Sequence, residues 1–158
     1  MPTVLSWNKI VCPTDFSAGS IEALAQATEL AQHFQAGLYL VHVLPTQPET
    51  PEWEGEADVP GVERLLSSEA EGRLRKLAKP IDEKGLRTKV VIIHGDPAEQ
   101  IVRLAEDENA DLIVIATHGT TGWRHLAFGS VTEKVVRHAM CPVLTIRVGG
   151  AHSVAGQT

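Results

Sequence analysis

Ser130 opens a helical pattern that follows a glycine-rich stretch, and together these residues could bind an anion. The first backbone N–H groups of a helix have no partner within that helix, so they form a positive end that suits a phosphate group. Gly119 and Gly122 would let the preceding loop pass close to such a group, and the hydroxyls of Ser130 and Thr132 could add hydrogen bonds. The residues alone leave two interpretations open: a phosphate site, or a long connection whose glycines serve only turns.

Two established phosphate motifs do not match this stretch. The P-loop pattern needs a lysine directly before Ser130, where Gly129 stands, and no G-x-G-x-x-G follows a predicted strand. Arg124 is the nearest residue that is certain to be positively charged. Phosphate binding here would therefore depend mainly on backbone N–H groups.

Two acidic residues could take part in chemistry near this stretch. Asp15 follows the first predicted strand, where it could accept hydrogen bonds from ribose hydroxyls, help hold a metal ion through water, or cap the next helix. Glu133 lies one turn into the helix that Ser130 opens and could act as a general base, although a solvated helix face is the commoner place for such a residue. We predict a binding role for Asp15 and no catalytic residue.

The sequence shows no set of protein ligands for a metal. Five of the seven histidines fall on different predicted elements, without the i, i+4 spacing of a helical metal pair: His42, His94, His118, His125 and His138. Of these, His118 borders the phosphate candidate. Cys12 and Cys141 each precede a proline, outside any C-x-x-C spacing, so we expect buried reduced thiols. We expect Mg²⁺ only as a companion of bound phosphates.

The elements that would position these residues alternate between strand and helix. Apolar runs predict strands at 9–12, 38–44, 88–95, 111–117 and 142–147. Apolar residues at helical spacing predict a first helix ending near Gly37 and a second over 66–81 that ends at Gly85, with a possible kink at Pro80. A third helix begins with Asp96 as cap and Pro97 in its first turn, and a fourth covers 130–139.

This alternation predicts an α/β fold, with an open five-stranded parallel sheet and helices on both faces. Such sheets bind ligands outside the carboxyl ends of their strands, where the strand order reverses. If the first and fourth strands are central neighbours, the segments after them, 13–15 and 116–119, meet at that crevice. We expect a single domain over residues 1–148, with an acidic, mobile loop at 46–61 and a flexible tail at 149–158.

Charge and hydropathy exclude two classes of partner. The net charge of −6 argues against non-specific binding to nucleic acid, which needs lysine and arginine to neutralise phosphates. No run approaches the ~20 apolar residues that span a membrane, and no basic segment followed by a long apolar one begins the chain. We therefore expect a cytoplasmic protein without nucleic-acid or membrane partners.

Gly119, nine further residues and then Gly129-Ser130 resemble the G-x2-G-x9-G-[ST] signature of the ATP-binding branch of the universal stress protein family. The likeness covers most of the chain, through CPTDFS, LVHVL, HGDPAEQIV, ADLIVIATHG and GSVTEKVVRHAMCPVLTIR. The resemblance implies a Rossmann-like fold of the adenine nucleotide alpha hydrolase type, with ATP or AMP as ligand. It also implies a homodimer that pairs through the last strand, Val143 to Arg147.

The resemblance further implies which residues contact the nucleotide. It places Pro13, Thr14, Asp15 and Val43 around the adenosine, and Gly119, Gly129, Ser130, Val131 and Thr132 on the phosphates. Without the resemblance, Val43 would be interpreted as core packing. Ala116 stands where the signature has its first glycine, which adds a methyl group beside the expected ribose. Thr120 stands where a basic residue often occurs, so we expect weakened rather than abolished binding.

We predict a nucleotide-binding module in the stress response that changes its affinity for a partner when the nucleotide is bound. Two alternatives stay open: a dimeric interaction protein of the same family without nucleotide, and a slow ATP hydrolase. Phosphoryl transfer needs charge neutralisation and a positioned nucleophile, and no lysine occupies the cradle. A phospho-receiver domain matches the sequence poorly, because Asp96 caps a helix and Arg147, not a lysine, follows the fifth strand.

Overall fold

The computed structural model describes residues 6–46, 59–118 and 128–147, in which strands and helices alternate along the chain. The strands are β1 (Lys9–Pro13), β2 (Gly37–Leu44), β3 (Thr88–His94), β4 (Leu112–Ala116) and β5 (Val143–Ile146). The helices are α1 (Ala18–Phe34), α2 (Val59–Asp82), α3 (Pro97–Asp107) and α4 (Ser130–His138). The alternation confirms the α/β class that the sequence predicts.

The strands form one parallel sheet in the order β3-β2-β1-β4-β5. β1 and β4 are neighbours, with Ile10 opposite Leu112 and Val11 opposite Ile113, which confirms the expected central pair. From this pair the sheet continues through β2 and β3 on one side and through β5 on the other. The strand order therefore reverses between β1 and β4, at the position where a ligand site is expected.

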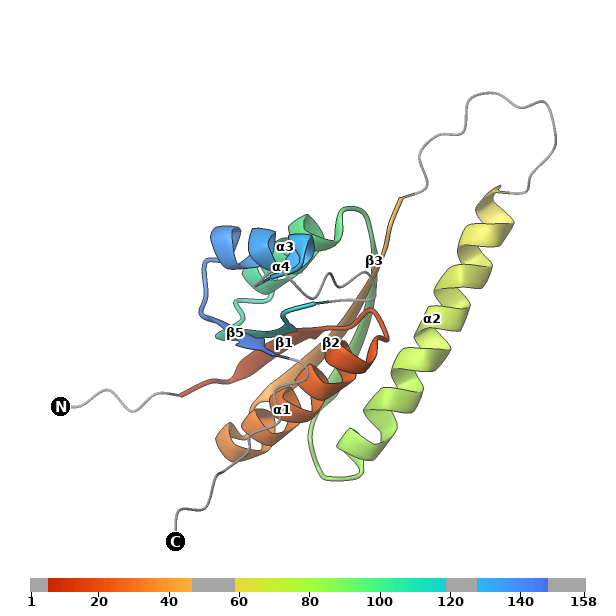
Figure 1. Ribbon diagram of the computed structural model, residues 1–158. Coiled ribbons are helices and arrows are strands. Elements are labelled where there is room, and N and C mark those ends of the chain that lie inside the picture. The colour runs from red at the N-terminus through yellow and green to blue at the C-terminus, as the bar shows by residue number, and fades with distance from the viewer. Residues whose placement is uncertain (1–5, 47–58, 119–127, 148–158) are drawn as a thin grey trace, which may run out of the picture.

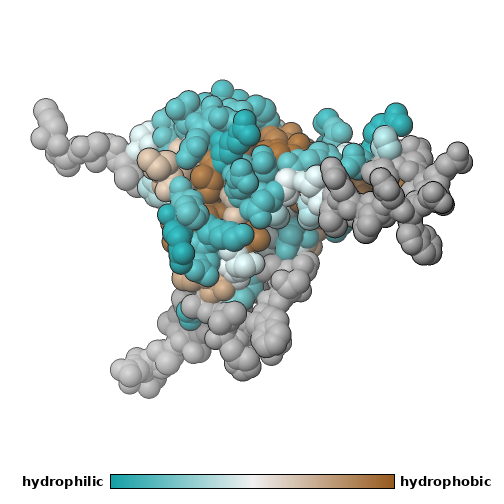
Figure 2. All heavy atoms as spheres, turned by 90° about the horizontal axis from the view of Figure 1, so that it is seen from above, coloured by the Kyte–Doolittle hydropathy of each residue, from teal (hydrophilic) through white to brown (hydrophobic). Residues whose placement is uncertain are grey.

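Alternate strand residues build a separate core on each face of the sheet. On one face, Ile10 belongs to a cluster with Leu74 of α2 and residues of α1. On the other, Val11 packs with Ile101 of α3 and Val135 of α4. Figure 1 shows these two helix layers on opposite sides of the sheet. In the view from above, hydrophilic side chains predominate, with smaller apolar areas between them (Figure 2).

The ends of β1 and α1 differ from the prediction. Pro13 belongs to β1 and pairs with Val41, although we expected the strand to stop at residue 12. The ladder tolerates this proline because the next N–H, that of Thr14, donates to the Val41 carbonyl at 2.8 Å. At the end of α1, Gln35 takes the left-handed conformation (φ 54°), whereas Gly37 is already the first residue of β2.

α2 is longer than predicted and begins inside the expected acidic loop, at Val59. Its C-terminal half packs on the sheet through buried residues such as Leu74 and Ile81. The helix continues past Pro80 to Asp82, because in the last turn the loss of one hydrogen bond does not end a helix. Leu66 is 39% exposed, because the N-terminal half of α2 extends beyond the sheet (Figure 1). The rest of the predicted loop, 47–58, and the tail lie outside the described residues.

Both cysteines are free thiols. Cys12 is fully buried in β1, and burial raises the pKa of its thiol to about 12. Cys141 is half-buried, and burial also raises the pKa of its thiol. Among the helices of the described ranges, none is long and apolar enough to cross a membrane.

Candidate functional site

A pocket of about 210 Å³ lies at the carboxyl ends of β1 and β4, where the strand order reverses. Its walls come from the ends of β1, β2 and β4 and from the first turns of α3 and α4. The following predicted site residues line it: Pro13, Thr14, Asp15, Val43, Ala116, Gly129, Ser130, Val131 and Thr132. Gly119 lies outside the described residues. The fold thus gathers residues from both ends of the chain around one cavity.

The N-terminus of α4 supplies backbone hydrogen-bond donors to this pocket. The N–H groups of Ser130, Val131 and Thr132 have no hydrogen-bond partner among the described residues. We predicted that Gly129 contacts the phosphates, but its N–H is already used, because it donates to the Thr117 carbonyl at 2.6 Å. This bond ties the end of β4 to the start of α4 and leaves the three following N–H groups for a ligand.

The hydroxyl of Thr132, predicted to donate to the anion, has another partner. It donates to the Ala116 carbonyl oxygen at 2.7 Å, and the residue is only 3% exposed. The hydroxyl therefore joins α4 to β4, and Thr132 can offer a ligand only its backbone N–H. Ser130 is exposed, and its hydroxyl has no partner within the described part of the chain. Of the two hydroxyls, that of Ser130 remains the candidate donor.

The local fold does not require glycine at position 129. The backbone there has φ −71° and ψ 160°, which any residue adopts. A Cβ atom would lie 3.4 Å from the Thr117 carbonyl oxygen, an ordinary van der Waals contact. Helix caps favour Ser, Thr, Asp or Asn, whose side chains accept hydrogen bonds from the first turn. No side chain of a described residue caps α4, so glycine leaves these N–H groups available.

Asp15 lines the pocket and also shapes the turn into α1. Its Oδ1 accepts hydrogen bonds from the backbone N–H of Ser17 at 3.0 Å and from the Ser17 hydroxyl. Ser17 in turn caps α1 by accepting from the N–H of Ser20 at 3.2 Å. Asp15 therefore supports the start of α1 indirectly, and its role toward a ligand stays a prediction.

Thr14 is held by hydrogen bonds to three neighbouring segments. Its N–H donates to Val41, as described above, and its carbonyl accepts from Nδ1 of His42 at 2.7 Å. Its hydroxyl lies 2.8 Å from the Ser20 hydroxyl and accepts from the N–H of Phe16 at 3.0 Å. Because a carbonyl oxygen only accepts, His42 must carry a proton on Nδ1. This wall of the pocket is thus well ordered by its own contacts.

The pocket also contains residues that the sequence analysis did not assign to it: Ser20, Val41, His42, Pro97, Ile101 and Ile115. Val41 and Ile115 lie just before the predicted site residues Val43 and Ala116 on β2 and β4. Their position near the strand ends could have indicated that they line the pocket. Pro97 and Ile101 reach the pocket because α3 starts beside it, and no local pattern encodes that placement. His118, predicted to border the site, lines the pocket, with Nδ1 3.0 Å from the Thr117 hydroxyl.

Glu133 is not among the residues that line the pocket. Its carboxylate pairs with Arg137 at 2.7 Å, and both side chains are more than half exposed. This is the arrangement expected of a solvated helix face. Across residues 6–46, 59–118 and 128–147, no group of three or more His, Cys, Asp or Glu side chains could hold a metal ion.

The strand order and the pocket define a doubly wound α/β protein with a cavity at its topological switch point and a helix N-terminus in the cavity wall. The Universal stress protein family matches the chain over residues 6–147. The chain therefore belongs to the universal stress protein family.

Individual relatives agree with this assignment. Universal stress protein MJ0531 of Methanocaldococcus jannaschii is 37% identical over 142 residues, which are 89% of this chain and 82% of that protein. The structure of universal stress protein UspA from Lactobacillus plantarum matches with a TM-score of 0.77 at 28% identity, over 91% of this chain and 100% of the other. The universal stress protein from Archaeoglobus fulgidus in complex with dAMP shares the fold, with a TM-score of 0.63 at 23% identity, over 90% of this chain and 99% of the other.

Proposed function

We propose that this universal stress protein binds an adenine nucleotide, ATP or AMP, and acts as a regulatory module in the stress response. The observation that carries the proposal is the set of N–H groups of Ser130, Val131 and Thr132 at the edge of the pocket, which have no hydrogen-bond partner within the described ranges. A phosphate group would accept hydrogen bonds from them and gain from the positive end of α4. Occupancy of the pocket would then change the affinity for a partner.

The remaining walls of the pocket suit a nucleoside. Val43 of β2, Ile101 of α3 and Ile115 of β4 contribute apolar side chains, against which a base can be buried. We assign the ribose to the region of Asp15 and Ala116, where the carboxylate would accept hydrogen bonds from hydroxyl groups. The dAMP complex of the Archaeoglobus fulgidus relative supports an adenine nucleotide as the ligand class.

We propose binding rather than rapid turnover. No lysine or arginine lines the described part of the pocket, and Glu133 is paired with Arg137 on the helix surface. Phosphoryl transfer needs positive charge on the phosphates and a positioned nucleophile. Mg²⁺ held by the phosphates and water would supply some of this charge, so slow ATP hydrolysis is the upper limit.

We further propose a homodimer that pairs through residues 143–147. β5 is an edge strand, and edge strands offer unpaired backbone groups to another chain. Apolar side chains are exposed on β5, on the turn before it and on α4: Leu144, Met140 and Val136. A second copy would cover such residues.

One observation favours a second candidate, an interaction protein of the same family that binds no nucleotide. Ala116 lines the pocket, and the family signature has glycine at this position. If the methyl group of Ala116 blocks the ribose, the module would act through its dimer alone.

The first experiment is to purify the protein without added nucleotide, denature it, and identify the released small molecules by chromatography and mass spectrometry. We expect an adenine nucleotide near one per chain. Calorimetric titration with ATP and AMP then measures both affinities. A protein that is empty and also ignores millimolar ATP would exclude the binding module and favour the interaction protein.

A further inference from the structure

Phe16 has an unusual backbone conformation directly after the residues that form one wall of the pocket. Its φ of 63° lies in the left-handed region, which a bulky residue rarely adopts. Its N–H donates to the Thr14 hydroxyl, and the next residue, Ser17, donates to Asp15. The conformation of Phe16 therefore helps to set how Thr14 and Asp15 meet the pocket.

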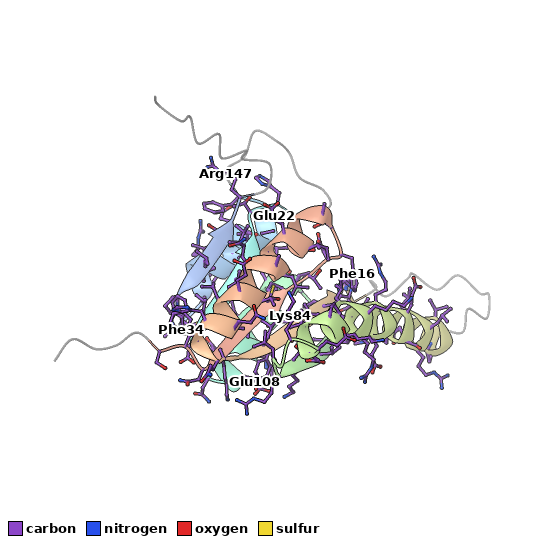
Figure 3. All side chains as sticks on the ribbon, turned by 90° about the horizontal axis from the view of Figure 1, so that it is seen from below. Phe16, Glu22, Phe34, Lys84, Glu108 and Arg147 are labelled. Carbon is purple, nitrogen blue, oxygen red and sulfur yellow. The ribbon has the colours of Figure 1, made fainter. Side chains whose placement is uncertain are left out.

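The ring of Phe16 contacts side chains from two other elements. The ring of His42 on β2 lies at a centroid distance of 4.6 Å, tilted by 41°. The guanidinium carbon of Arg73 on α2 lies over the Phe16 ring, 3.8 Å from its centroid. Figure 3 shows Phe16 where the loop before α1 meets α2. A cation at this distance from an aromatic face is attracted by the ring.

These contacts form a continuous chain from α2 to the pocket. Arg73 contacts Phe16, Phe16 contacts His42, and His42 donates a hydrogen bond to the Thr14 carbonyl at 2.7 Å. Thr14 is 4% exposed and lines the pocket. Arg73 itself makes no ion pair with a described residue, whereas Arg75 on the same helix pairs with Glu71 at 2.6 Å. The contact with Phe16 is thus the interaction that distinguishes Arg73.

We propose that Arg73 is a positioning residue for the pocket, which acts through the Phe16 ring to hold the segment 13–17 in its ligand-binding shape. The ligand in this inference is that of the proposed function, but the effect on the segment does not require a ligand. Without Arg73, the left-handed backbone of Phe16 loses one of its stabilising contacts and keeps the His42 ring, the core and the hydrogen bond to the Thr14 hydroxyl. The hydrogen bonds that Phe16 and Ser17 donate within the segment 13–17 would then break more often.

The first test measures amide hydrogen exchange in the ligand-free protein. In Arg73→Ala, the N–H groups of Phe16 and Ser17 should exchange about two- to fivefold faster, while those of α4 stay unchanged. Arg75→Ala is the matched control and should leave Phe16 and Ser17 as in the wild type. Arg73→Lys, which keeps the positive charge, should fall between wild type and Arg73→Ala. Equal exchange at Phe16 and Ser17 in all four proteins would overturn the proposal.

The second test is a calorimetric titration with ATP and with adenosine. Because the segment 13–17 borders the nucleoside, Arg73→Ala should weaken both ligands by a similar factor of about two to five. The double variant Arg73→Ala/Phe16→Leu should bind both ligands with the same affinity as Phe16→Leu alone, because the arginine acts through the ring. Unchanged affinities in Arg73→Ala, or additive losses in the double variant, would contradict the inference. If wild type binds neither compound, the proposed function fails, and the exchange experiment still decides whether Arg73 holds the segment.

Discussion

At the scale of single residues, Gly129 matters for the side chain that it lacks. Its backbone lies in a region open to any residue, so a positive φ does not explain the glycine. A serine or asparagine here would cap α4 with a side-chain hydrogen bond and stabilise it by roughly a few tenths of a kcal/mol relative to glycine. The glycine instead leaves the first turn of α4 open at the pocket, which is what a bound phosphate requires.

Gly129→Val should weaken ATP binding about tenfold or more, because the branched side chain obstructs charge-assisted hydrogen bonds to the first turn of α4. The fold should survive, since φ −71° and ψ 160° suit valine. Calorimetric titration measures the dissociation constant. Gly72→Ala is the control, because a Cβ atom there meets nothing within 4 Å. Equal ATP affinity in Gly129→Val and wild type would mean that α4 does not hold the phosphates.

Ala116→Gly tests the departure from the family signature. Ala116 is buried at the end of β4 and lines the pocket. If its methyl group presses on the ribose, removing it should tighten ATP binding a few-fold in the same titration. An unchanged dissociation constant would show that the methyl group does not touch the nucleotide.

At the scale of elements, α3 shows how a local signal can place part of the pocket wall. Asp96 caps the helix by accepting from the N–H of Glu99 at 3.0 Å, and Pro97 occupies the first turn. The cap fixes where α3 begins, and Pro97 and Ile101 then form part of the pocket wall. Capping and site geometry are therefore linked at this helix.

Asp96→Ala should lower the free energy of unfolding by about 1 kcal/mol, through loss of the cap. The ion pair between Asp96 and Lys134, at 3.7 Å and largely exposed, should add little. Urea unfolding measures the change. The control is Asp107→Ala, which removes an exposed 3.8 Å pair with Arg103 and should shift stability by less than about 0.5 kcal/mol. Equal losses in the two variants would contradict the capping role.

At the scale of the whole molecule, the two edges of the sheet differ. β3 forms one edge and pairs with β2 along its whole length. β5 forms the other edge, is shorter, and carries the partly exposed Leu144. The turn before β5 holds Met140, which is 84% exposed. An apolar edge of this kind is a natural place for a second copy of the chain.

Leu144→Asp should convert the proposed dimer to monomer, because a carboxylate would be buried without a partner at the edge of β5. Analytical ultracentrifugation measures the mass in solution. Val62→Asp is the control: Val62 is 53% exposed and belongs to α2, which lies on the opposite side of the molecule from β5 (Figure 1), so its replacement should leave the dimer intact. A monomeric wild type would exclude the dimer altogether.

Much of the fold could be predicted from the sequence because its signals are local. Apolar runs and helical spacing predicted every strand and helix of the described chain, and Asp96 predicted the start of α3. The element ends were less predictable. Gln35 rather than Gly37 takes the left-handed position after α1, because the tertiary structure already commits Gly37 to pairing with Lys9.

The sequence by itself determined the α/β class, the parallel sheet and the residues that follow β1 and β4, because periodicity and capping act over a few residues. Only the tertiary structure decided which polar groups remain for a ligand. The Gly129 N–H and the Thr132 hydroxyl are used in bonds to the end of β4, and Arg73 reaches Phe16 from a separate helix. These contacts join segments that are distant along the chain, so no local pattern could contain them.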